Sequence, residues 1–275
     1  MAIELARRDE FAVITINRPD ALNALNATLL TELRAAFSDV DRGDCRAVLV
    51  TGAGTKAFCT GADIKELRGR TALEHKGSME YGQSVFAMLD DLRMPSIAVI
   101  NGYAFGGGLE LALACTLRIA TSNAKMGLPE IKLGLIPGYG GTQRLPRVVG
   151  EARALELIMS GRTVGADEAL RTGLISRIVT GDPLEAGMAF AREFSSHSRP
   201  ALACVRSAVS RAVGTTLSEG LKIETDLAGL AYQTQDAAEG MAAFIEKRQQ
   251  RSVDRSHRRG NGRRRICSRQ CRSSR

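Results

Sequence analysis

The stretch Asn101-Gly-Tyr-Ala-Phe-Gly-Gly-Gly-Leu-Glu-Leu-Ala-Leu-Ala-Cys115 decides the fold, because it joins a glycine cluster to an apolar helix that carries one carboxylate. The apolar residues 96–100 before it predict a buried strand, and the helix is expected from Gly106 to Ala114. Glu110 falls in the first turn of that helix. Glycines let a backbone approach a ligand closely, and amides at a helix N-terminus attract negative charge. The pattern therefore predicts a backbone pocket for an anionic oxygen with a carboxylate beside it.

A second carboxylate follows in the segment Gly127-Leu-Pro-Glu-Ile-Lys-Leu-Gly134. Glu130 stands between Pro129 and the apolar run 131–136, where we expect burial. Carboxylates are seldom buried unless they are paired or functional. The ordinary alternatives are an acid that complements a helix dipole, for Glu110, and an exposed loop acid, for Glu130. We prefer a functional interpretation, because two carboxylates beside an oxyanion pocket can move a proton next to a carbonyl group.

Three separated motifs resemble those of the enoyl-CoA hydratase/isomerase (crotonase) family, with a pattern closest to the enoyl-CoA hydratases. They are the segment 106–114, the segment 127–144 that ends in Ile-Pro-Gly-Tyr-Gly-Gly-Thr-Gln-Arg, and the upstream block Lys56-Ala-Phe-Cys-Thr-Gly-Ala-Asp-Ile-Lys-Glu66. The resemblance covers residues 3–248. It implies an α/β crotonase fold, in which repeated ββα units form a parallel-sheet core and an all-helical C-terminal region serves trimerisation.

The resemblance also assigns roles to individual residues. Glu110 and Glu130 are the implied catalytic pair, in which one glutamate activates a water and the other handles the proton at the α-carbon. The amides of Ala62 and Gly107 are the implied oxyanion hole, and the backbone of Gly138 is implied to help hold the water. The residues implied to contact coenzyme A are Asp63, Ile64, Lys65 and Lys247. A solvated surface position is an equally ordinary interpretation for each of the two lysines.

Retention of both glutamates implies a hydratase, because the family's isomerases, decarboxylases, thioester hydrolases and dehalogenases generally lack or replace one. The implied activity is that of a hydro-lyase: reversible syn addition of water to a trans-2-enoyl-CoA, giving the (S)-3-hydroxyacyl-CoA, in fatty acid or amino acid and short-chain acyl-CoA degradation. No cofactor is expected, since coenzyme A enters with the substrate. The alternative is a methylglutaconyl-CoA hydratase-like enzyme or an enoyl-CoA isomerase, with RNA binding through a basic tail. A trimer or a dimer of trimers is the expected assembly.

We expect three regions: a core over 1–182, a helical oligomerisation region over 183–248, and a tail over 249–275. The formal charge of +8 lies entirely at the C-terminus. Residues 247–275 hold 12 Lys and Arg and one acid, whereas residues 1–246 hold 26 basic and 29 acidic residues. Such a basic and apolar-poor tail is predicted to be disordered. It is either an arm for nucleic acid or an acidic partner, or a segment without a role; we favour the second, so nucleic acid is not an expected partner.

Other classes of protein are disfavoured. No apolar run approaches the roughly 18 residues of a membrane helix, and the N-terminus lacks an apolar signal core, so we expect a cytoplasmic protein without a membrane partner. The six cysteines form no C-x-x-C pair and the three histidines are scattered, so no metal site is expected. Gly52-Ala-Gly-Thr-Lys-Ala57 resembles a dinucleotide fingerprint, but an extended stretch over 58–61 follows where that fingerprint requires a helix.

Periodicity and capping signals predict the remaining elements. A hairpin is expected from strands 3–5 and 12–16, followed by a helix over 27–41 that Asn26 caps. Further strands are expected over 47–50, 117–120 and 174–179. Further helices are expected from near Asp63 and over 75–92, 148–160, 166–172, 184–197, 200–213, 217–230 and 234–247.

Overall fold

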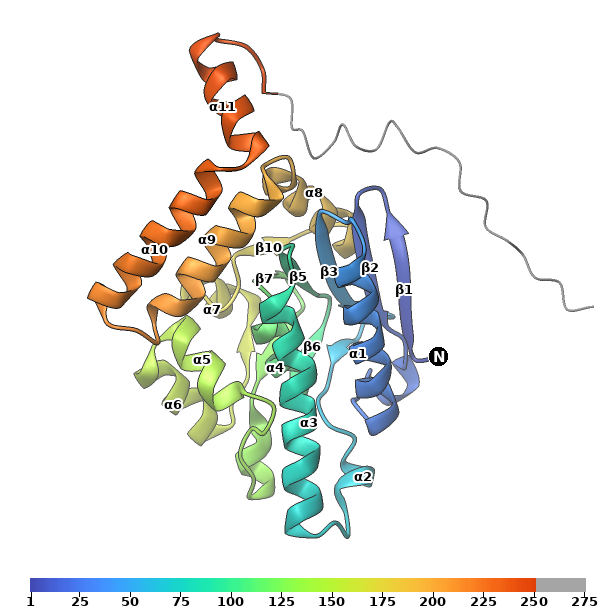
Figure 1. The fold of residues 1–275 in the computed structure, drawn as a ribbon. Coiled ribbons are helices and arrows are strands. Elements are labelled where there is room, and N and C mark those ends of the chain that lie inside the picture. Colours follow the sequence, from blue (N-terminus) through green and yellow to red (C-terminus); the bar gives the residue numbers. More distant parts are fainter. Residues whose placement is uncertain (251–275) are drawn as a thin grey trace, which may run out of the picture.

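The structure, a computed structural model, describes residues 1–250 and is built on a six-stranded sheet (Figure 1). Its strand order is β1-β2-β3-β5-β7-β10. The first two strands form the expected antiparallel hairpin, and every other pairing in this sheet is parallel. The strands are β1 (Ile3–Arg8), β2 (Phe11–Ile16), β3 (Ala47–Gly52), β5 (Ser96–Ile100), β7 (Leu117–Thr121) and β10 (Arg177–Val179).

A second sheet of very short strands lies after the ends of the first, in the order β4-β6-β8-β9. Its strands are β4 (Ala57–Cys59), β6 (Tyr103–Phe105), β8 (Lys125–Gly127) and β9 (Val164–Gly165). Strands β3, β5 and β7 of the large sheet are each followed directly by a strand of the small one. This repeated strand–strand–helix order confirms the expected α/β fold class.

The central strands are buried on both faces, which explains their continuous apolar sequences. Along β3, Val48 and Val50 face one core cluster, whereas Leu49 faces the other. The first cluster is covered by α1 (Ala27–Arg42), α3 (Ala72–Asp91) and α4 (Gly107–Ala114). The second is covered by α8 (Pro183–Ser195), which packs on β3, β5 and β7.

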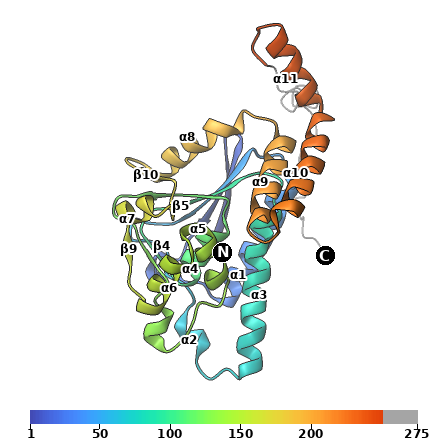
Figure 2. The same cartoon turned by 90° about the vertical axis from the view of Figure 1, so that its left-hand side faces the viewer.

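The remaining elements are helices. They are η1 (Pro19–Ala21), α2 (Ile64–Leu67), η2 (Pro129–Leu133), α5 (Gly141–Val149), α6 (Glu151–Ser160), α7 (Ala166–Arg171), α9 (Arg199–Ala212), α10 (Leu217–Tyr232) and α11 (Gln235–Ile245). Helices α9 to α11 extend away from the sheets, and both views show α11 at the end of the molecule opposite α2 (Figures 1 and 2). The expected boundary at 182 falls at the N-cap of α8.

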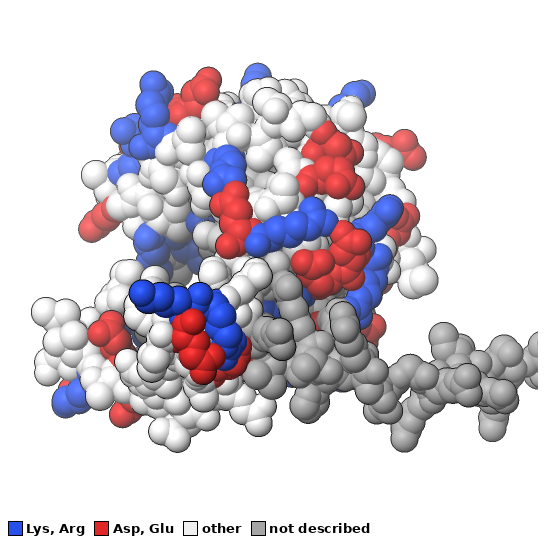
Figure 3. Space-filling model, turned by 90° about the horizontal axis from the view of Figure 1, so that it is seen from above, with Lys and Arg blue, Asp and Glu red and all other residues white. Residues whose placement is uncertain are grey.

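Two expectations about local structure are wrong. The single helix expected over 148–160 is two helices, because Gly150 has φ 82° and separates α5 from α6. The apolar run 131–136 is exposed, not buried; Ile136, for example, is 68% exposed. The tail expected from 249 lies outside the described residues from 251 onward. Over the face seen in Figure 3, acidic and basic side chains are interspersed, in keeping with the near-neutral charge counted for residues 1–246.

Candidate active site

The backbone amides of Ala62 and Gly107 lie near each other, just after the ends of β4 and β6. Gly61 has φ 91°, a conformation that only glycine adopts without strain. A Cβ at Gly61 would lie 2.8 Å from the carbonyl oxygen of Phe105 and 3.1 Å from the amide nitrogen of Gly107. The turn that carries Ala62 therefore packs directly against the start of α4, as the implied oxyanion hole requires.

Both of these amides are free to bind a ligand oxygen. The amide of Gly107 belongs to the first turn of α4, where no carbonyl of the same helix can accept it. On the other side, the neighbours of Ala62 are engaged, since the carbonyl of Gly61 accepts from Leu25 and the amide of Asp63 donates to Leu25. Within residues 1–250, no hydrogen bond from the amide of Ala62 or Gly107 to another protein group is found. The arrangement can stabilise a negatively charged oxygen.

Glu110 lies one turn further along α4, and its side chain is only 1% exposed. Its Oε1 accepts two hydrogen bonds, from the amides of Tyr139 at 2.8 Å and Gly141 at 2.7 Å. Burial raises the pKa of Glu110 to about 7, and the charge of Glu130 raises it as well, while the hydrogen bond from Gly141 opposes them. The carboxyl is thus held in one orientation and exchanges its proton near neutral pH.

Glu130 approaches the same place from the other side, on η2. A Cβ at Gly106 would lie 2.9 Å from Glu130 Oε1, so this carboxyl lies against the residue that precedes Gly107. Its Oε2 is buried and has no hydrogen-bond partner among the described residues. Burial raises the pKa of Glu130 above its usual value. A buried polar atom without a partner is costly, which indicates that a water or ligand group completes this site.

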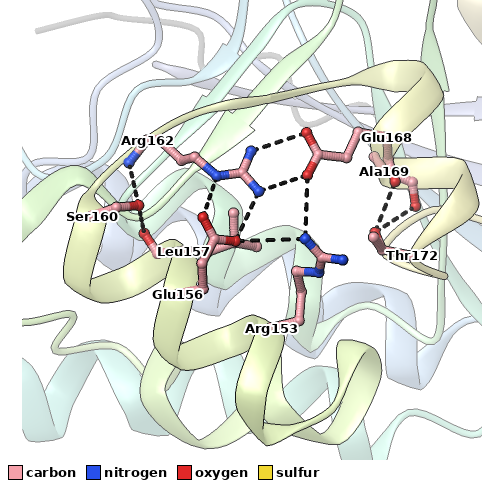
Figure 4. A network of polar contacts seen from close by, with 8 residues as sticks. All are labelled: Arg153, Glu156, Leu157, Ser160, Arg162, Glu168, Ala169 and Thr172. Carbon is pink, nitrogen blue, oxygen red and sulfur yellow. Dashed lines mark hydrogen bonds and ion pairs between the residues drawn. The ribbon is translucent and has the colours of Figure 1, made fainter.

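A network of charged side chains joins α6, α7 and the loop between them (Figure 4), and this loop contacts the segment that carries Glu130. Arg162 binds Glu156 of α6 and Glu168 of α7, with ion-pair distances of 2.5 and 2.7 Å. These contacts fix the loop after α6. In that loop Gly161 packs on η2, where an added Cβ would lie 2.9 Å from Ile131 Cγ2. The network therefore connects two helices to the residue after Glu130.

The loop that binds Glu110 also contains Gly138, whose carbonyl accepts a 2.8 Å hydrogen bond from Gln83 of α3. This contact anchors the loop to α3. Tyr139, in the same loop, is a site residue to which the sequence analysis assigned no role. Its ring packs edge to face on Phe86, with 5.6 Å between ring centroids. No local pattern marks this contact, because it joins α3 to a loop more than fifty residues later.

The residues implied to contact coenzyme A fall into two groups. Asp63 caps α2 and pairs with Arg18 at 3.4 Å, and the exposed residues Ile64 and Lys65 follow it, so all three adjoin Ala62. Lys247 follows α11, at the opposite end of the molecule, so one chain does not bring it to the other three (Figure 2).

The loop that resembles a dinucleotide fingerprint leads into β4, as the sequence indicated, and not into a helix. Asn101 donates to the carbonyls of Gly52 and Gly54 at 2.7 and 2.8 Å, so the loop is bound to the start of the next motif. Within the described part of the chain, no group of three or more His, Cys, Asp or Glu side chains is arranged to hold a metal ion. No helix in residues 1–250 is long and apolar enough to span a membrane.

Comparisons with known proteins agree with this geometry. The profile of the enoyl-CoA hydratase/isomerase family matches residues 7–254. A probable enoyl-CoA hydratase of Mycobacterium bovis is 46% identical over 247 residues, covering 89% of this chain and 95% of that protein. A crotonyl-CoA hydratase of Syntrophomonas wolfei is 41% identical, covering 90% and 95%. The crystal structure of an enoyl-CoA hydratase from Bacillus anthracis superposes with a TM-score of 0.87 at 37% identity, covering 91% of this chain and 98% of that one.

Proposed function

Because this chain belongs to the enoyl-CoA hydratase/isomerase family, we propose that it hydrates trans-2-enoyl-CoA thioesters to (S)-3-hydroxyacyl-CoA. The observation that carries the proposal is a buried glutamate, Glu110, and a half-buried one, Glu130, beside two unpaired amides. Glu110 is fixed by two hydrogen bonds, whereas Glu130 keeps a buried Oε2 without a partner. A water held between the two carboxyls supplies that missing partner. Retention of both acids favours hydration over isomerisation.

In the proposed reaction, the oxygen of the water bonds to C3 of the enoyl group, and one glutamate takes the proton that the water releases. The electrons of the C2=C3 bond move toward the thioester carbonyl, whose oxygen becomes negatively charged. The amides of Ala62 and Gly107 stabilise that oxygen. The other glutamate gives a proton to C2, which completes the addition. Burial raises the pKa of both carboxyls, and for Glu110 it reaches about 7, so Glu110 can hold or release a proton near neutral pH.

We propose that the substrate's coenzyme A lies over the start of α2, where Asp63, Ile64 and Lys65 adjoin the oxyanion amide. No other cofactor takes part in this reaction. Lys247 can contribute only if a second copy of the chain brings its α11 to this site.

We also propose that the protein is a homo-oligomer, a trimer or a dimer of trimers, joined through its C-terminal helices. Large apolar side chains on these helices are exposed, an arrangement typical of an interaction surface. They include Val205, Val209, Val213, Leu221, Leu230, Phe244 and Ile245. Sedimentation of the wild type and Val209→Asp tests the proposal. A lighter species in the variant supports it, and a monomeric wild type contradicts it.

A cytoplasmic location is part of the proposal. The four cysteines among residues 1–250 are free, and three of them are buried. Unpaired thiols are typical of a reducing compartment.

The activity is tested by following the loss of enoyl absorbance when purified protein meets crotonyl-CoA. Glu110→Gln and Glu130→Gln should each lower the rate by about 10²–10⁴-fold, the usual contribution of an acid or base. The control is Glu80→Gln, which alters an exposed glutamate of α3; its rate should match the wild type. A folded wild-type protein that leaves crotonyl-CoA and longer enoyl thioesters unchanged contradicts the proposal.

A further inference from the structure

The side chain of Tyr139 lies beside the place where the proposed function puts the thioester. Its own amide binds Glu110, and its ring contacts the residue that carries the second oxyanion amide: a Cβ at Gly107 would be 3.1 Å from Tyr139 Cδ2. The side chain is also 9% exposed, so the ring is an internal wall of the site and not part of the outer surface.

The ring is held on its flanks. Gly82 of α3 makes room for it, because a Cβ there would lie 2.5 Å from Tyr139 Cε1. Glycine destabilises a helix interior relative to alanine. The close approach of the ring explains why a glycine nevertheless occupies this position. Phe86, one turn along the same helix, packs edge to face on the ring, with 82° between the planes. Burial raises the pKa of the Tyr139 hydroxyl, and Ser78, which lies near the tip of the ring, opposes that shift.

A cavity of about 30 Å³ lies against the ring, next to the turn that carries Ala62 and Asp63. Ala62, Leu25 and Leu30 line it together with Tyr139. On this side, the wall of the cavity is the fixed ring of Tyr139.

Polar side chains line part of this cavity. Arg70 and Ser78 line it, and Arg70 Nη1 donates to Ser78 Oγ at 3.0 Å. Arg70 also pairs with Glu66 at 3.8 Å. An alkyl chain that extended through this cavity as far as Arg70 and Ser78 would have to separate these groups from one another without replacing their hydrogen bond, which is unfavourable.

We propose that Tyr139 sets an upper limit on acyl length, so that this site acts on short straight-chain enoyl thioesters such as crotonyl-CoA and rejects long ones. This inference rests on the proposed hydratase function. The fixed ring closes the acyl pocket after the first carbons of the chain. Gly82 and Tyr139 form a complementary pair in which the missing side chain of one makes room for the ring of the other.

The test compares kcat/KM for crotonyl-CoA and trans-2-decenoyl-CoA. The wild type should strongly prefer crotonyl-CoA. Tyr139→Ala should raise the ratio of decenoyl to crotonyl activity by roughly tenfold or more, since each newly buried methylene contributes about fourfold. Tyr139→Phe is the matched control: it removes only the hydroxyl and keeps the ring, so the ratio should stay at the wild-type value. Thermal unfolding identifies folded variants, and Tyr139→Leu replaces the alanine variant if that one does not fold.

Two outcomes overturn the inference: a wild type that turns over both thioesters equally well, and a folded alanine or leucine variant with an unchanged ratio. Both are distinct from failure of the proposed function, in which crotonyl-CoA itself is not hydrated.

Discussion

Replacing Glu110 with glutamine should stabilise the folded protein in a pH-dependent way. Glutamine is nearly isosteric with a protonated glutamate, and its Oε1 can still accept from the amides of Tyr139 and Gly141. What the substitution removes is a carboxylate that must ionise in a site where it is 1% exposed and close to Glu130. The change therefore isolates the free energy of placing that charge in the core.

The magnitude follows from the pKa of Glu110, which is raised from 4.5 to about 7 in the folded state. Below pH 4.5 the carboxyl is protonated in both states. Between pH 4.5 and 7 the unfolded chain releases this proton and the folded one keeps it, so wild-type stability falls as pH rises. The loss is complete above pH 7 and amounts to about 3 kcal/mol, at 1.36 kcal/mol per unit. The advantage of Glu110→Gln should grow by this amount over the same window.

The measurement is urea unfolding of both proteins at several pH values from about 4.5 to 8.5, at one fixed protein concentration because an oligomer's stability depends on it. The control is Glu80→Gln, which breaks an exposed pair with Lys76 at 3.7 Å. Exposed pairs contribute at most about 1 kcal/mol, so its difference from the wild type should be small and nearly constant with pH. If the difference between wild type and Glu110→Gln also stays constant, the raised pKa of Glu110 is wrong.

Three further changes test other parts of the structure. Gly61→Ala places a Cβ at φ 91° and against Phe105, so the turn that carries the Ala62 amide must move. Steady-state kinetics with crotonyl-CoA should show a loss of about 10²–10³-fold in kcat. Near-normal turnover would contradict the proposed oxyanion hole. Asn26→Ala removes the side-chain cap of α1 and should lower the free energy of unfolding in urea by about 1 kcal/mol, whereas an unchanged midpoint would mean that the cap contributes nothing. Arg162→Met should lower kcat more than it changes KM, because the ion pairs of Arg162 hold the loop that contacts η2. The control Arg177→Met breaks another exposed ion pair and should leave both constants unchanged. Equal effects of the two variants would show that the Arg162 network does not act through Glu130.

Much of the large sheet and its helices could be predicted because their signals are local. Asn26 caps α1 as expected, accepting from the amide of Leu29 at 2.8 Å. The four helices expected after residue 183 all form, with ends that differ by a few residues. Helix α3 begins at Ala72, earlier than expected, because Thr71 and Glu74 form a capping box.

The small sheet could not be predicted in the same way. Its strands have two or three residues each, too few for an alternating pattern. Strands β4, β6 and β8 each continue from a strand of the large sheet, whereas β9 follows α6 and pairs with β8. Helix α5 was missed for a related reason: it begins within the glycine-rich loop at Gly141 and contains Pro146, both unfavourable signals for a helix. Its start is fixed by tertiary structure, since the amide of Gly141 binds Glu110.

The contact between Tyr139 and Glu110 explains how one loop can serve both chemistry and selectivity. The loop holds the carboxyl through its backbone amides, and the anchor from Gln83 to Gly138 also uses the backbone. The side chain at 139 therefore takes no part in orienting Glu110 and is free to shape the acyl pocket. Its own constraint comes from α3, where Gly82 must leave space for the ring. In the proposed enzyme, a smaller residue at 139 can therefore change the acyl preference without a change in the carboxyl pair, whereas a larger residue at 82 requires a smaller one at 139.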